Sequence, residues 1–198
     1  MSEGAPAPAG GVPPAAEPAD AADEDLMTAY ADGDASAFDV LYGRHRGAAY
    51  RYFRRQLSEA EANDCFQTLW MNLIRHRDRY APDAPFRHYL FTLAHNVLMD
   101  HHRREMRRPV HAPLDADELQ DGAPAPEERH QRERLRAHLH RLIQALPPHQ
   151  REVWLLRQET DFSNRDIATV TGASEEGVKS RLRYARGKLK EGMARYAG

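Results

Sequence analysis

Apolar residues recur at helical spacing through the first half of the chain, three and four positions apart, over 36–53, 58–74 and 86–108. Ser36 precedes the first stripe, and we expect it to be the N-cap of that helix. Ser58 is followed three residues later by an acid, the pattern of a capping box. No segment alternates with period two for long enough to predict a strand.

The second half of the chain shows the same helical spacing in shorter stretches. The predicted helices cover 135–146, 148–156, 163–170 and 175–190. Pro147-Pro148 separates the first two of these helices, and the second proline suits the first turn of the helix that follows. The third helix begins with another capping box, and a tight turn with glycine separates it from the fourth.

Two segments lack the large apolar side chains that a folded core requires. The first 22 residues are mostly Ala, Pro and Gly, and the segment near residue 120 is acidic and carries four prolines. We therefore predict an all-α chain with two small helical domains, divided as follows: a disordered acidic tail (1–24), a first helical domain (25–108), a flexible acidic linker (109–133) and a second helical domain (134–198).

The charge of the chain alternates between these parts. Net charges are −9 over 1–43, +6 over 44–108, −5 over 109–133 and +6 over 134–198, which together give the net −2 of the 198 residues. Two basic domains separated by an acidic linker indicate two surfaces that face a polyanion.

Several classes of protein are disfavoured by composition. No apolar run approaches the twenty or so residues of a membrane span, and no signal peptide precedes the first domain, so we expect a cytoplasmic protein without membrane insertion. The single Cys65 rules out a disulfide framework. His95, His102 and the triplet at 100–102 suggest a metal site, but they lie in an amphipathic helix among arginines, and we predict no metal, no cofactor and no enzyme activity.

The pair of helices at 163–170 and 175–190 has the form of a helix-turn-helix. The second helix is basic on its outer side, and a helix of that width fits the major groove of DNA. The residues expected to contact DNA are Ser174, Glu176, Gly177, Lys179, Ser180, Arg181, Arg183, Tyr184 and Arg186.

These motifs resemble the extracytoplasmic-function sigma factors of bacterial RNA polymerase, in the sigma-70 family. The resemblance to region 4 rests on LPPHQREV at 146–153, DFSNRDIA at 161–168, TGAS at 171–174 and GVKSRL at 177–182. The first domain resembles region 2 independently, through EANDCFQ at 61–67 and FRHYLFTLAHN at 86–96.

The resemblance implies an alternative sigma factor that binds core RNA polymerase, through the clamp coiled coil and the flap, and opens promoter DNA. Helix 175–190 would read the minus-thirty-five element, and an anti-sigma factor is the expected inhibitor. The residues implied for docking on polymerase are Asp64, Gln67, Thr68, Met71 and Asn72.

The first domain would hold the minus-ten element as single strand. Unstacking bases costs a few kcal/mol per step, which binding must offset, and aromatic rings with a cationic track achieve this. The implied residues are Arg79, Tyr80, Arg87, Asn96, His101, Arg103 and Arg104, followed by Arg107 and Arg108.

Two residues depart from the family pattern. Thr68 stands where an acid is common, and Tyr184 stands where Arg is common, which predicts a different minus-thirty-five preference. One alternative is a one-component helix-turn-helix regulator that does not act as a polymerase subunit, and a more distant one is a sigma-mimicking adaptor.

Overall fold

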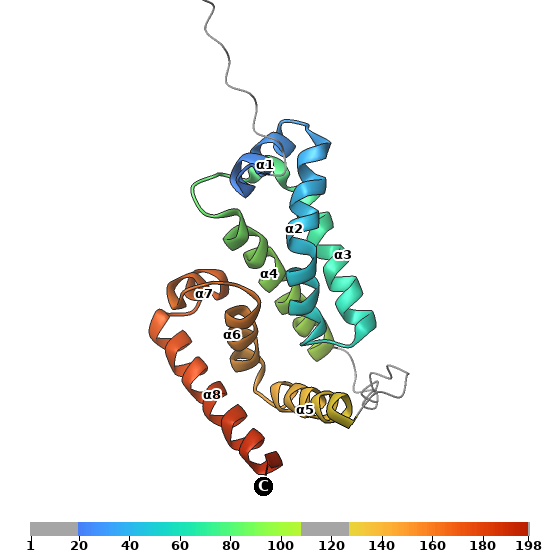
Figure 1. Ribbon diagram of the computed structural model, residues 1–198. Coiled ribbons are helices and arrows are strands. Elements are labelled where there is room, and N and C mark those ends of the chain that lie inside the picture. Colours follow the sequence, from blue (N-terminus) through green and yellow to red (C-terminus); the bar gives the residue numbers. More distant parts are fainter. Residues whose placement is uncertain (1–19, 108–126, 198) are drawn as a thin grey trace, which may run out of the picture.

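The computed structural model describes residues 20–107 and 127–197, and these parts contain helices and no strands, as predicted (Figure 1). None of the described helices is both long and apolar enough to span a bilayer. The helices are α1 (Asp23–Ala31), α2 (Ala35–Arg54), α3 (Glu59–Arg75), the 3₁₀ turn η1 (Arg77–Arg79), α4 (Phe86–Arg107), α5 (Glu127–Gln144), α6 (Pro148–Glu159), α7 (Asn164–Thr171) and α8 (Glu175–Ala197).

The predicted capping boxes of α3 and α7 are confirmed. The Ser58 hydroxyl accepts from the Glu61 N–H at 3.4 Å, and a Glu61 carboxylate oxygen accepts from the Ser58 N–H at 3.0 Å. The prediction for α2 is wrong. The Asp34 carboxylate accepts from the Ser36 N–H at 2.9 Å, so Asp34 is the N-cap and Ser36 lies in the first turn. An ionised side chain is a stronger acceptor for the helix N-terminus than a hydroxyl.

Helix α1 was not predicted, and its first two acids were assigned to the tail. One Asp23 oxygen accepts from Arg44 Nη1 at 2.6 Å, and the other lies 2.6 Å from His45 Nε2. A Glu24 oxygen accepts from the backbone N–H of Phe86 at 2.7 Å, where α4 begins. These acids therefore hold α1 against α2 and against the N-terminal end of α4, which a pattern of apolar residues does not reveal.

The first domain packs α2, α3 and α4 side by side, with α1 across one end (Figure 1). Its core is fully buried and includes Leu41, Phe53, Leu69, Leu73 and Phe91. The first four of these side chains lie on the apolar stripes that the sequence pattern assigned to α2 and α3, and these stripes face the core as expected.

The second domain is built on α8, which packs against α5, α6 and α7. Helices α5 and α8 approach closely at Gly192, where an added Cβ would lie 2.4 Å from a methyl carbon of Leu142.

Helix α5 begins at Glu127, inside the segment predicted as a linker. The rest of that segment, to residue 126, and residues 1–19 lie outside the described residues, as does Arg108.

The two helical domains are in direct contact, which the sequence did not predict. Phe162 of the second domain packs edge-on against Phe91 and His88 of the first domain, at centroid distances of 5.7 and 4.7 Å. One hydrophobic cluster runs through both domains, and α7 lies against α4 (Figure 1).

Two buried carboxylates of α6 bind the first domain at this contact. Glu152 accepts from the Tyr52 hydroxyl at 2.7 Å and lies 2.6 Å from His95 Nδ1. Glu159, seven residues along the same helix face, pairs with Arg51 at 2.7 Å and Arg55 at 2.6 Å. Both acids are almost completely buried, so their charge depends on these partners.

Replacing Glu152 with alanine is expected to lower the free energy of unfolding by about 3 kcal/mol, because the buried Tyr52 hydroxyl and His95 ring lose their shared partner. Urea unfolding followed by circular dichroism measures the loss. Asp39→Ala removes an exposed acid of α2 and is the control, with an expected change within about 0.5 kcal/mol. Equal stabilities of the two variants would contradict the role given to Glu152.

Candidate nucleic-acid and polymerase interface

Helices α7 and α8 form the predicted helix-turn-helix. Gly172 ends α7 with φ of +64°, a left-handed conformation that favours glycine. The Ser174 hydroxyl accepts from the Gly177 N–H at 3.1 Å and so caps α8. A Cβ at position 177 would lie 3.0 Å from that hydroxyl oxygen, so Gly177 leaves room for the cap. Buried Ile167 and Val178 fix the two helices against each other.

The outer face of α8 presents the residues expected to contact DNA. Of these nine residues, Gly177 and Arg181 are half-buried, and the exposed ones are Ser174, Glu176, Lys179, Ser180, Arg183, Tyr184 and Arg186. The Lys179 ammonium lies 3.4 Å from Glu175 and 3.9 Å from Glu176. A phosphate that binds Lys179 therefore competes with two carboxylates of the first helical turn. The Tyr184 ring, one of the two departures from the family pattern, is half exposed and accessible.

The C-terminal end of α4 gathers one part of the residues expected to hold the minus-ten strand. Arg103, Arg104 and Arg107 line a shallow hollow of about 370 Å³ together with Asp100. Asn96 is exposed on the same helix, roughly 10 Å before Arg103 along the axis. His101 is half-buried and lies 3.3 Å from Glu61 of α3, so its ring is directed at a carboxylate.

The remaining expected minus-ten residues lie at the other end of α4, roughly 24 Å away along the axis. Tyr80 packs against Tyr89 and Phe86, with centroids 5.2 and 6.2 Å apart, and burial raises the pKa of its hydroxyl to about 12. Arg87 donates to the backbone oxygen of Glu159 at 3.2 Å and faces Asp161 of the second domain. Arg79 is exposed. The seven predicted residues therefore do not form one continuous surface.

Helix α3 exposes the residues expected to dock on polymerase. Asp64, Gln67 and Met71 are exposed, and Thr68 and Asn72 are half-buried. The Thr68 hydroxyl donates to the backbone oxygen of Asp64 at 2.7 Å. This face also carries an exposed apolar residue that the sequence analysis did not select. Ile74 is 38% exposed and lies three residues after Met71, which is 57% exposed. Residues three apart share a helix face, so the two form a small apolar strip.

Trp70 is buried, as expected for a core residue.

The interdomain acids Glu152 and Glu159 were not predicted from the sequence, although their spacing indicates that both lie on a buried helix face. Their seven-residue spacing places both on the face of α6 that also buries Val153 and Leu156. Acids on an apolar helix face indicate partners in another element, but they do not identify those partners.

Family models match both domains. The model of sigma-70 region 2 matches residues 41–108, and the model of sigma-70 region 4 matches residues 136–189. The two matches occur in the order that the sequence motifs predicted.

Whole-chain relatives agree with these matches. RNA polymerase sigma factor CarQ of Myxococcus xanthus is 29% identical over 166 residues, which cover 83% of this chain and 94% of CarQ. The ECF RNA polymerase sigma factor SigM of Mycobacterium tuberculosis (strain ATCC 25618 / H37Rv) is 30% identical over 168 residues, covering 84% of this chain and 82% of SigM.

Solved structures share the arrangement of helices. CnrH in complex with the cytosolic domain of CnrY superposes with a TM-score of 0.64 at 26% identity, covering 85% of this chain and 95% of CnrH. The sigma factor RpoE in complex with the anti-sigma factor NepR from Bartonella quintana has a TM-score of 0.63 at 20% identity, covering 79% and 96%, and supports the fold alone. The two regional matches and the coverage of these relatives show that the chain belongs to the ECF sigma factors of the sigma-70 family, which are alternative sigma factors of transcription initiation.

Proposed function

We propose that the chain binds core RNA polymerase through α3, the minus-thirty-five duplex through α8 and the opened minus-ten strand through the C-terminal half of α4. The observation that carries this proposal is the presence of two exposed basic surfaces on different domains, the outer face of α8 and the arginine cluster that ends α4. Each surface is on a rigid helix, so each holds its cationic groups at fixed spacing along a polyanion.

Transcription with purified components tests this function. With core polymerase and promoters selected from random templates, the chain is expected to start transcription at a cognate site that core polymerase alone does not use. A one-component regulator would bind the same DNA without enabling core polymerase to initiate.

We further propose that the chain has no catalytic site of its own and acts in the cytoplasm, where polymerase is found.

The relatives suggest an additional partner. RpoE of Bartonella quintana was solved with an anti-sigma factor, and CnrH was solved with a domain of CnrY. We propose by analogy that an anti-sigma factor also binds this chain and competes with polymerase.

The α8 surface contacts DNA through phosphates as well as bases. Replacing the exposed Arg183 with alanine is expected to weaken binding to a minus-thirty-five duplex and to reduce the slope of log K against log salt by about 1, because one phosphate contact is lost. Fluorescence anisotropy over a salt series measures both quantities. Arg195→Ala, about 18 Å farther along α8, is the matched control and is expected to leave the slope unchanged.

An unchanged slope for Arg183→Ala would remove this residue from the duplex contact. A similar decrease for both variants would show that any cation on α8 contributes by general electrostatic attraction, with no docked face.

The minus-ten contact depends most on the residues that are exposed in the structure. Asn96, Arg103 and Arg104 are exposed on α4, and the two arginines contact Asp100 of the same helix. Tyr80 packs against aromatic rings of α4, Arg87 contacts the second domain and His101 pairs with α3, whereas Arg79 is exposed far from the end of α4. We therefore propose that Asn96, Arg103 and Arg104 hold the strand while the two domains are in contact, and that Tyr80, Arg87 and His101 would first have to leave their contacts with other elements.

The double substitution Arg103→Ala with Arg104→Ala is expected to reduce initiation on an intact promoter at least about tenfold, with a smaller loss on a promoter premelted at the minus-ten element. The reason is that the premelted template already carries the unstacking cost that these contacts offset. Abortive-transcript yield on the two templates measures the effect, and the premelted template is the internal control. Equal losses on both templates would contradict a role in strand capture.

The apolar strip of α3 suits a protein partner. Met71→Lys is expected to lower affinity for core polymerase about tenfold, because a charge enters an apolar contact, with little change in stability at an exposed position. Met106→Lys is the matched control, since Met106 is 79% exposed at the end of α4. Titration of labelled core polymerase measures both affinities. Equal affinities of the two variants would place the docking surface elsewhere.

A further inference from the structure

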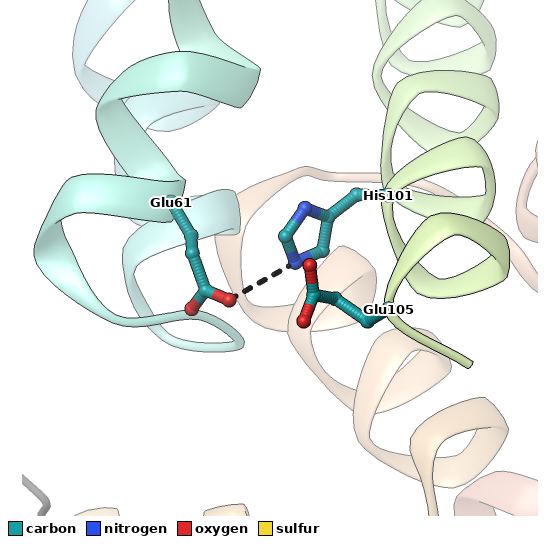
Figure 2. A group of neighbouring side chains, drawn as sticks. All are labelled: Glu61, His101 and Glu105. Atoms are coloured by element: carbon teal, nitrogen blue, oxygen red, sulfur yellow. Dashed lines mark ion pairs between the residues drawn. The ribbon is translucent and has the colours of Figure 1, made fainter. Parts of the chain in front are cut away.

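Three potential metal ligands meet where α3 and α4 run side by side. His101 Nε2 lies 3.3 Å from a carboxylate oxygen of Glu61, and Glu105 lies one turn beyond His101 on α4. One ligand atom from each residue lies within 4.8 Å of the other two. Figure 2 shows Glu61 reaching from α3 toward the His101 ring, with the Glu105 carboxylate beside that ring.

The spacing of these groups is close to what a metal ion requires. Zinc binds histidine nitrogen and carboxylate oxygen at about 2.0–2.2 Å, which places tetrahedral ligands roughly 3.4 Å apart. The ion pair between His101 and Glu61 already has this separation. The remaining contraction involves Glu105, which lies one turn beyond His101 on α4.

The hollow beside the cluster is lined by more acidic than basic groups. The three ligands border a hollow of about 170 Å³, enough for an ion and its bound water. The hollow is lined by Glu61, Asp64, Cys65, Thr68, His101, Arg104 and Glu105. Three carboxylates face one guanidinium, and the Arg104 Nε donates to the backbone oxygen of Asp100 in its own helix. This lining favours a divalent cation, and Arg103 and Arg107 of the same end of α4 line a separate hollow.

We propose that Glu61, His101 and Glu105 bind a divalent transition-metal ion of the zinc class, with water as the fourth ligand. An imidazole with two carboxylates selects this class over calcium or magnesium, which prefer oxygen ligands alone. On the sequence alone, a metal site at the histidines of α4 is disfavoured because they lie in an amphipathic helix among arginines. The third ligand comes from forty residues upstream.

Metal binding at this place would join the two functional helices of the first domain. Glu61 lies on α3 one turn before Asp64, on the proposed polymerase face, and His101 lies within the basic end of α4. A bound ion would stabilise the contact between α3 and α4 and would hold His101 away from a DNA strand.

The experiment uses the full untagged chain without polymerase or DNA, so its outcome is independent of the proposed function. Zinc is titrated in competition with a chromophoric chelator, and cobalt is titrated by its visible absorption. We expect one high-affinity zinc per chain. His101→Gln and Glu105→Gln are each expected to weaken zinc binding at least about tenfold, since each removes a ligand. Zinc should raise the thermal midpoint of the native chain and not of either variant.

Two matched controls separate this site from adventitious binding by the other histidines and acids. His149→Gln removes an exposed histidine of α6, and Glu59→Gln removes an exposed acid of α3, and both are expected to keep the native affinity. Circular dichroism confirms that each variant is folded. Absence of zinc binding by the native chain, or native affinity in both ligand variants, would overturn the proposal.

Discussion

The arrangement of this chain depends on one buried carboxylate, Glu152. Removing a charge from water costs several kcal/mol unless hydrogen bonds replace the lost hydration. Both partners of Glu152, Tyr52 and His95, belong to the first domain, whereas Glu152 belongs to the second. Burial and the nearby charge of Glu152 raise the pKa of Tyr52 well above its usual value, so its hydroxyl keeps its proton and donates. These hydrogen bonds therefore hold the two domains in one relative position.

This contact also determines which cationic residues of the first domain already have a protein partner. Arg51 and Arg55 are attached to Glu159, and Arg87 reaches the second domain through the backbone oxygen of the same residue. The side chains of Arg51 and Arg55 remain 54% and 40% exposed, but all three arginines have partners in the second domain. The arginines at the end of α4 and those on α8 lie outside the contact, and they are the ones proposed to face a polyanion.

Several side chains with a proposed function have a protein partner in the free chain. Lys179 is paired with acids of its own helix, His101 is paired with Glu61, and Arg87 spans the domain contact. Binding of DNA must therefore exchange one polar contact for another. Such an exchange lowers affinity but increases discrimination, since only a ligand that replaces the lost contact well is favoured.

The sequence by itself determined helices α2 to α8, most of their caps and the helix-turn-helix. These features depend on spacing within a few residues, such as the capping box of Ser58 and the left-handed turn at Gly172. It also determined the family, since the motifs of both regions are local.

Only the tertiary structure decided which polar groups meet across the fold. The pairing of Glu152 with Tyr52 joins residues 100 positions apart, and Glu61 reaches His101 from another helix. The contacts of Asp23 and Glu24 that attach α1 to the domain likewise cannot be predicted from the spacing of apolar residues. The physical reason is that helical periodicity reports which face of an element is buried. It contains no information on which charged groups will share that buried space.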